Sequence, residues 1–170
     1  MIELFKNSLI GQFHAALSIF NDCVSRCPAE QWEHNVGNYP FWNVAYHTLF
    51  YVDFYLSPNE ESFSPQGFHR ENSEHFVPPH EKVIPDDPYD QTTLRGYVQH
   101  CKRKAIESIT SETPESLAGP SGFSWYKIPR VEFHLNNIRH LQHHAAQMSL
   151  HLRNSAEIDI RWVGSGFKDG

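Results

Sequence analysis

The chain has 170 residues, of which 39% are hydrophobic and 14% aromatic, enough for one folded domain with its own core. Its formal net charge is −6 and no stretch is rich in lysine and arginine, which argues against a nucleic-acid partner. The longest apolar stretch, residues 41–56, contains Asn43, His47 and Asp53, so it is too short and too polar to span a membrane. The N-terminal residues do not resemble a signal peptide, and we expect a cytoplasmic protein.

Apolar residues spaced three and four apart predict a first helix from Ile2 to Cys27, which Pro28 ends. Its expected buried stripe is Leu9, Phe13, Ala16, Leu17 and Phe20. A second helix is predicted from Pro40 to Leu56, because proline suits the first helical position. Its expected buried face comprises Phe41, Val44, Ala45, Thr48, Tyr51, Val52 and Tyr55.

A long proline-rich loop is predicted from Pro58 to Asp90, where no helical or strand period survives. Its aromatic residues, Phe63, Phe68, Phe76 and Tyr89, can pack on the helices. Two interpretations remain open: a lid over a pocket mouth, or an excursion that packs on the flank of the helices or on a dimer partner.

A third helix is predicted from Gln91 to Thr110, capped by Asp90 or Thr92, with Leu94, Val98, Cys101, Ala105 and Ile109 as its core stripe. A second irregular segment, Pro114 to Pro129, is expected to lie outside the core, as is the first. A fourth helix follows from Arg130 to Arg153, and the tail, 154–170, is expected to lie as an extended strap. These elements predict a single all-α domain over residues 1–170, a four-helix bundle.

The most unusual feature is histidine, with twelve residues in the chain. His140 and His144 lie four residues apart on the fourth helix, so both imidazoles can reach one metal ion. His47 is the best candidate for a third ligand, because it lies within an apolar helix where an unpartnered ring would be costly. A hydrogen-bonded core histidine is the alternative interpretation of His47. His143 lies nearer the edge of this helical face and is a weaker candidate.

The other histidines are expected to be solvent-exposed or loop residues rather than ligands, namely His14, His34, His69, His75, His80, His100 and His134. The zinc-protease motif His-Glu-x-x-His and the di-iron motif Glu-x-x-His are both absent from the sequence. Cys23 and Cys27, four residues apart, are interpreted as small buried residues in preference to a redox or metal pair.

Two motifs resemble those of the DinB-like superfamily. Residues 42–47, Trp-Asn-Val-Ala-Tyr-His, are similar to its second-helix motif, and residues 140–147 are similar to its last-helix motif His-x-x-x-His-Arg-Gly-Gln. The closing residues 162–164 also resemble the endings of some members. The resemblance implies an up-down-down-up bundle, one zinc or nickel ion held by His47, His140 and His144, and frequent homodimers. Ala145 and Ala146 stand where the family motif usually has Arg-Gly. Because of this departure, the substrate of a particular family member is not transferred to this chain.

Two functions follow from this reasoning. The first is a metal-dependent hydrolase, or a thiol S-transferase, acting on a small molecule with or without a thiol cosubstrate. The second is a protein that binds metal or a small ligand without turnover. A haem or electron-transfer bundle is a third class that paired histidines allow. The sequence identifies no catalytic residue and no cofactor beyond the divalent ion; Gln147 and His151 are candidates for orienting a bound group.

Overall fold

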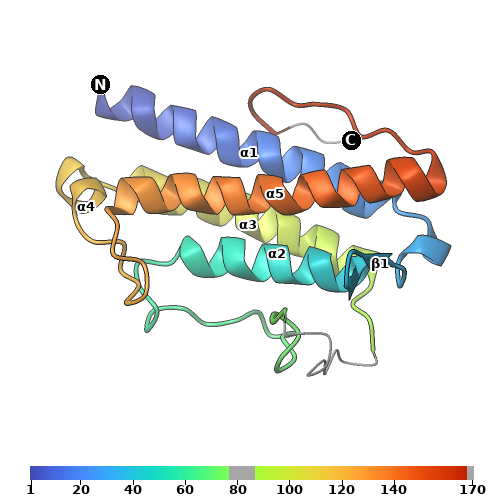
Figure 1. The fold of residues 1–170 in the computed structure, drawn as a ribbon. Helices are drawn as coiled ribbons and strands as arrows, with labels where there is room; N and C mark the ends of the chain where they lie inside the picture. Colours follow the sequence, from blue (N-terminus) through green and yellow to red (C-terminus); the bar gives the residue numbers. More distant parts are fainter. Residues whose placement is uncertain (77–86, 168–170) are drawn as a thin grey trace.

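The computed structural model describes residues 1–76 and 87–167, which are mostly helical (Figure 1). The predicted all-α class is therefore confirmed. The elements, in chain order, are helix α1 (Ile2–Arg26), the 3-10 turn η1 (Ala29–Gln31), the short strands β1 (Asn35–Val36) and β2 (Tyr39–Pro40), and the helices α2 (Phe41–Tyr55), α3 (Gln91–Ser111), α4 (Pro114–Ala118) and α5 (Arg130–Ala156).

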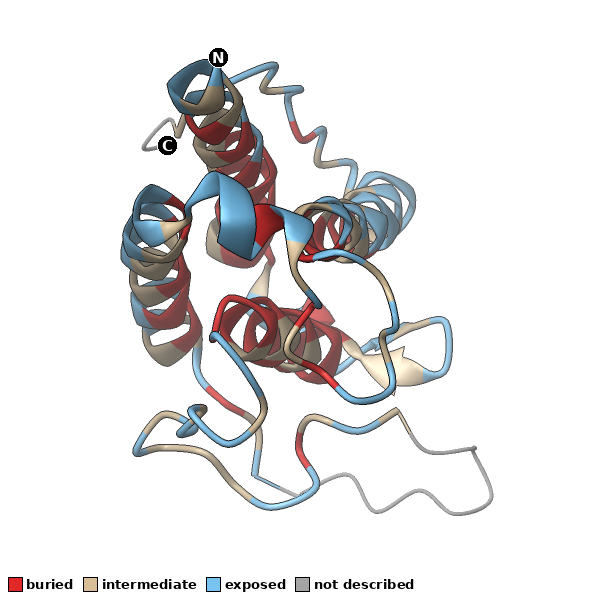
Figure 2. Cartoon of the chain, turned by 90° about the vertical axis from the view of Figure 1, so that its left-hand side faces the viewer, coloured by how far each residue is buried: buried red, intermediate tan, exposed pale blue. Residues whose placement is uncertain are grey.

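The four long helices lie side by side. Helix α1 packs against α3 and α5, and α2 packs against the same two helices. Helices α1 and α5 run in one direction, whereas α2 and α3 run in the other (Figure 1). The view along the helix axes shows that their buried faces point toward a shared interior (Figure 2). Within the described residues, no helix combines the length and the apolar character that a membrane crossing needs.

The predicted stripes of the first and third helices are confirmed, since every residue of both stripes is buried. The helix ends match simple local chemistry. Pro28 follows α1 closely, and the Asp90 side chain accepts a hydrogen bond from the Thr93 backbone N–H at the start of α3. Of the two predicted caps, Asp90 therefore caps α3.

A short hairpin between η1 and α2 was not predicted. Strands β1 and β2 pair Val36 with Tyr39, and Gly37 at the turn has a φ of +67°, a conformation that glycine adopts without steric cost. Two residues per strand are too few to show the alternation by which strands are recognised in a sequence. The hairpin places Tyr39 beside α2, where it meets the connection to α3.

The connection between α2 and α3 runs alongside α2 (Figure 1). Its described residues, 56–76 and 87–90, form no helix or strand, and the rest of the predicted loop lies outside the described residues. The prediction that this loop lies outside the core is wrong for Tyr89, which is only 2% exposed. Its ring stacks on Tyr46 at 4.3 Å, and its carbonyl accepts a hydrogen bond from the Trp32 indole. This covering layer explains why α2 is buried on nearly all sides.

The second irregular segment also contributes to the interior. It contains α4, which begins with a capping box formed by Thr113 and Ser116. Phe123, which is 4% exposed, packs against Phe133 of α5 at a ring distance of 4.8 Å. The expectation that residues 114–129 lie outside the core is therefore wrong, because one aromatic anchor fixes the segment to the helices.

After α5 the tail turns back along α1 (Figure 1). Ile160 is buried, the Gly166 N–H donates to the Gly11 carbonyl, and the Gln12 amide donates to the Gly164 carbonyl. The described tail, up to residue 167, is thus an extended strap, as the alternating sequence predicts.

Candidate metal centre

The structure brings together the three histidines that the sequence singled out. His47 comes from the middle of α2, and His140 and His144 come from successive turns of α5. Each offers one ring nitrogen, and these atoms all lie within 4.8 Å of one another. The Nε2 atoms of His47 and His140 are 3.4 Å apart. Three imidazoles from two packed helices therefore face a common point.

Hydrogen bonds to the opposite ring nitrogens orient two of the rings. His47 donates its Nδ1–H to the backbone carbonyl of Glu74 at 2.5 Å, and His144 donates its Nδ1–H to Gln147 Oε1 at 2.8 Å. Because a carbonyl oxygen only accepts, Nδ1 of His47 carries the proton and Nε2 keeps its lone pair. Partners of this kind fix the tautomer and the ring direction of histidines that bind metals.

The third ring is less completely satisfied. Nδ1 of His140 is buried and has no hydrogen-bond partner among the described residues. Its Nε2 faces the Nε2 of His47, which already bears a lone pair. Two facing nitrogen lone pairs repel unless a proton or a cation lies between them. A divalent cation held by Nε2 atoms fits this arrangement, so the donor set suits the ion that the resemblance implies.

Burial keeps all three rings neutral. Desolvation lowers the pKa of His47 to about 2, that of His140 to about 3 and that of His144 to about 4. Coulombic repulsion from neighbouring histidines acts in the same direction for each ring. The lone pairs are therefore available to a metal ion at neutral pH, because binding does not first require a proton to leave.

An aromatic layer covers the cluster. Phe76 stacks on the His47 ring at 3.7 Å between centroids and meets the His144 ring edge-on at 5.6 Å. Its other neighbour is Tyr39 of the hairpin, stacked at 4.2 Å. The Asn43 amide holds this segment by donating to the Ser73 carbonyl at 2.8 Å. The α2–α3 connection therefore lies directly over His47 and His144.

Sequence reasoning did not identify the roles of Asn43, Glu74 and Phe76. Phe76 was recognised only as one of several loop aromatics. Asn43 carries a signal in the sequence, since a polar residue one turn before His47 in an apolar helix needs a partner. The Glu74 contribution is a backbone carbonyl, which leaves no mark in the sequence. Gln147 was proposed to orient a bound group, and here it orients His144.

The remaining histidines are not part of the three-histidine cluster. His34, His75 and His143 are exposed, and His80 lies outside the described residues. His151 contacts the Gln31 side chain at 3.1 Å rather than the cluster.

The prediction that His134 is exposed is wrong, because its ring is fully buried. Its Nε2 lies 3.0 Å from Glu112 Oε1, to which Arg130 also donates at 3.0 Å. This group ties the start of α5 to the end of α3. Burial alone would raise the pKa of Glu112, but hydrogen bonds from His134, Ser116 and Arg130 outweigh it and lower the pKa to about 2.

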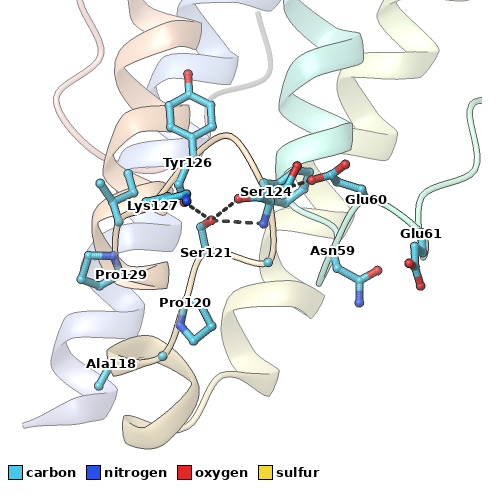
Figure 3. A pocket seen from close by; sticks show the side chains of 14 residues that line it. Asn59, Glu60, Glu61, Ala118, Pro120, Ser121, Ser124, Tyr126, Lys127 and Pro129 are labelled. Atoms are coloured by element: carbon cyan, nitrogen blue, oxygen red, sulfur yellow. Dashed lines mark hydrogen bonds between the residues drawn. The ribbon is translucent and has the colours of Figure 1, made fainter.

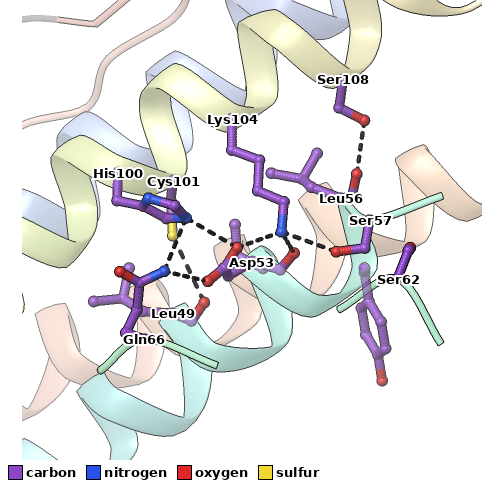
Figure 4. A network of polar contacts seen from close by, with 12 residues as sticks. Leu49, Asp53, Leu56, Ser57, Ser62, Gln66, His100, Cys101, Lys104 and Ser108 are labelled. Carbon is purple, nitrogen blue, oxygen red and sulfur yellow. Dashed lines mark hydrogen bonds and ion pairs between the residues drawn. The ribbon is translucent and has the colours of Figure 1, made fainter. Parts of the chain in front are cut away.

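Asp53 is the centre of a second polar network, between α2 and α3 (Figure 4). Its carboxylate accepts from Lys104 at 2.5 Å and from Tyr97 at 2.9 Å, and lies 3.1 Å from His100 Nε2. Burial disfavours the charge, yet the hydrogen bonds and the charge interactions with His100 and Lys104 hold the pKa of Asp53 below its ordinary value. The Gln66 amide also donates to it at 3.1 Å, which fastens the α2–α3 connection to both helices. This network is structural, since each of these polar side chains bonds to another member of the network.

The three cysteines are buried and unpaired. Burial raises the pKa of Cys23 and of Cys27 to about 12, so both are protonated thiols. Each lies near a different backbone carbonyl, that of Ala145 and that of Pro28. They are small core residues, in agreement with the favoured interpretation of their spacing.

A separate cavity lies away from the three histidines. It measures about 800 Å³ and is lined by residues 59–61, 118–124 and 126–129, beside the α4–α5 connection (Figure 3). None of the three clustered histidines lines it. The Ser121 hydroxyl in its wall is already bonded to the backbone of Phe123 and Tyr126, so it serves the loop itself.

Comparisons with known protein families, with curated proteins and with solved structures find no match. The functional interpretation therefore rests on the geometry of the three histidines and on the sequence motifs.

Proposed function

We propose that this chain is a DinB-like, up-down-down-up four-helix bundle that binds one divalent metal ion, zinc or nickel, through His47, His140 and His144. The observation that carries the proposal is the convergence of three neutral imidazoles, one buried and two half-buried, within 4.8 Å, two of them oriented by hydrogen bonds. Antiparallel pairing of α2 with α5 supports the bundle assignment.

We further propose that the protein is a metal-dependent hydrolase or thiol S-transferase that acts on a small molecule. A divalent ion with three protein ligands makes a bound water or thiol easier to deprotonate. The protein's own contribution is to position the ligands and to exclude water. The Glu74 carbonyl and Gln147 orient two rings, while Phe76 and Tyr39 shield the cluster.

A non-catalytic binding protein is the second candidate. The observation in its favour is that the described hydrogen-bond partners of the ligand rings are a backbone carbonyl and an amide, so none of them is an acid or a base. In this case the ion would stabilise the fold without supporting turnover.

Metal analysis of untagged protein tests the binding proposal. We expect one ion per chain in the parent and loss of that ion in variants with alanine at two of His47, His140 and His144. Replacement of His143 or His151 by alanine serves as the control and should leave the metal content intact. Metal that survives the double replacements would disprove the site.

Turnover distinguishes the two candidate functions. Thiol conjugates and amides should be consumed by the metal-loaded parent and left intact by the His47→Ala variant. Equal activity of parent and variant would disprove the proposed mechanism. Metal binding with no turnover of either class would favour the binding protein.

A further inference from the structure

A cavity of about 600 Å³ borders the histidine cluster at His140. Tyr55 and Tyr126 line one side of it, and Asn136, Arg139, His140 and His143 of α5 line the other. This volume lies in the range of pockets that hold small molecules. His140 is the residue that the cavity shares with the cluster, so a molecule bound here would contact one of the three rings.

The lining carries one arginine and no acidic side chain. It contains no aspartate or glutamate, although acidic residues outnumber basic ones by 20 to 14 in the whole chain. Within residues 1–76 and 87–167, the Arg139 guanidinium forms no ion pair or hydrogen bond, and neither does the Asn136 amide nor the His143 ring. The cavity therefore offers an unpaired positive charge together with further unused hydrogen-bond donors.

Helical spacing places the polar residues of the cavity wall on one side of α5. Asn136, Arg139, His140 and His143 are three, four and seven residues apart on α5, so they lie on adjoining parts of one side of the helix. The His143 ring also meets the His144 ring at 5.0 Å, which places the cavity wall beside a second ligand. A molecule held by Arg139 would therefore extend along α5 toward the histidine cluster.

We propose that this cavity binds a small molecule with an oxyanion group, a carboxylate or a phosphate, and that Arg139 recognises that group. The planar guanidinium presents paired donors that match either oxyanion. The tyrosine rings flank the remainder of the molecule, and its reactive end lies next to His140. This inference rests on the proposed function for its catalytic meaning, but the binding itself does not require an ion.

Ligand titration of the full chain tests the inference. Succinate and inorganic phosphate are the anionic probes, and succinamide is the uncharged control, each added to metal-free and zinc-loaded protein. Chemical-shift changes should appear in residues 136–146 with an anionic probe and be absent with succinamide. The probe that binds more tightly shows whether a carboxylate or a phosphate is the preferred group.

A matched pair of variants assigns the effect to one residue. Arg139→Gln removes the charge and should weaken anion binding on the order of tenfold, the usual effect of losing a charge-assisted hydrogen bond. Arg95→Gln is the control, since Arg95 is an exposed arginine on α3 that does not line the cavity. It should bind the probes like the parent. Equal weakening in both variants would show nonspecific attraction and overturn the inference.

The outcomes also separate this inference from the proposed metal function. Zinc binding with no anion binding would overturn the cavity and leave the metal site standing. Anion binding that depends on Arg139 in a protein that takes up no metal would support the cavity and refute the metal proposal. Equal binding of succinamide and succinate would overturn the assignment of an anionic ligand.

Discussion

Replacing His144 by glutamine in the metal-free protein should make folding less sensitive to acid. His144 is 7% exposed, and burial lowers its pKa from 6.5 to about 4. The native state therefore keeps this ring neutral, whereas the unfolded chain protonates it as the pH falls below 6.5. The stability that comes from the neutral His144 ring is fully present above pH 6.5 and is lost as the pH falls from 6.5 toward 4.

The size of this effect follows from the two pKa values. Between pH 7.5 and pH 5.0, preferential protonation of the unfolded state costs about 2 kcal/mol for one such histidine. Glutamine has no proton to bind in this range, so the variant lacks that loss. Its stability at pH 7.5 will also change because of packing, but that change does not depend on pH. The informative quantity is the difference in pH dependence between parent and variant.

The assay is urea denaturation at pH 7.5 and pH 5.0 with a chelator present. We expect the parent to lose about 2 kcal/mol more than His144→Gln over this interval. His143→Gln is the control, since this neighbouring ring is exposed and such substitutions usually change stability by less than about 0.5 kcal/mol. Equal losses in the parent and in His144→Gln would refute the view that His144 is buried as a neutral ring.

Three further predictions follow. Phe76→Ala should weaken zinc binding by about 10- to 100-fold in a chelator competition, because it removes the ring that stacks on the ligand His47. Phe63→Ala is the control, and equal weakening of zinc binding in that variant would contradict the prediction. Asp53→Asn should lower the free energy of unfolding, measured in urea, by about 2–3 kcal/mol. This loss is smaller than is typical for breaking a buried ion pair, because Lys104 can still reach water. An unchanged urea midpoint would refute the prediction. None of the three cysteines should react with a thiol reagent in the native protein, and rapid labelling before unfolding would show that the core is open.

Local sequence patterns predict the four long helices, α1, α2, α3 and α5, and bring together two of the three candidate ligands. The stripes of α1 and α3 follow from the helical period, which is a local property of the chain. The spacing of His140 and His144 is local in the same sense, because four residues on one helix bring two rings together whatever the helix packs against. Predicted helix ends differ from the observed ones by at most three residues.

Contacts between distant segments depend on how the helices and loops pack together. His47 and His140 are 93 residues apart, and the sequence alone left open whether His47 is a ligand or a hydrogen-bonded core residue. The connection between α2 and α3 was open to two interpretations, and its Glu74 carbonyl and Phe76 ring lie on the cluster. His134 was misjudged because its partner, Glu112, lies on another helix.

A side chain is buried or exposed according to which segment covers it. A backbone carbonyl such as that of Glu74 is the same group in every residue, so its role as an acceptor for His47 depends only on where the chain passes. Periodicity reports which face of a helix is apolar, but it does not report which segment will lie against that face. The surroundings of the three histidines are therefore set by packing among α2, α5 and the connection that runs alongside α2.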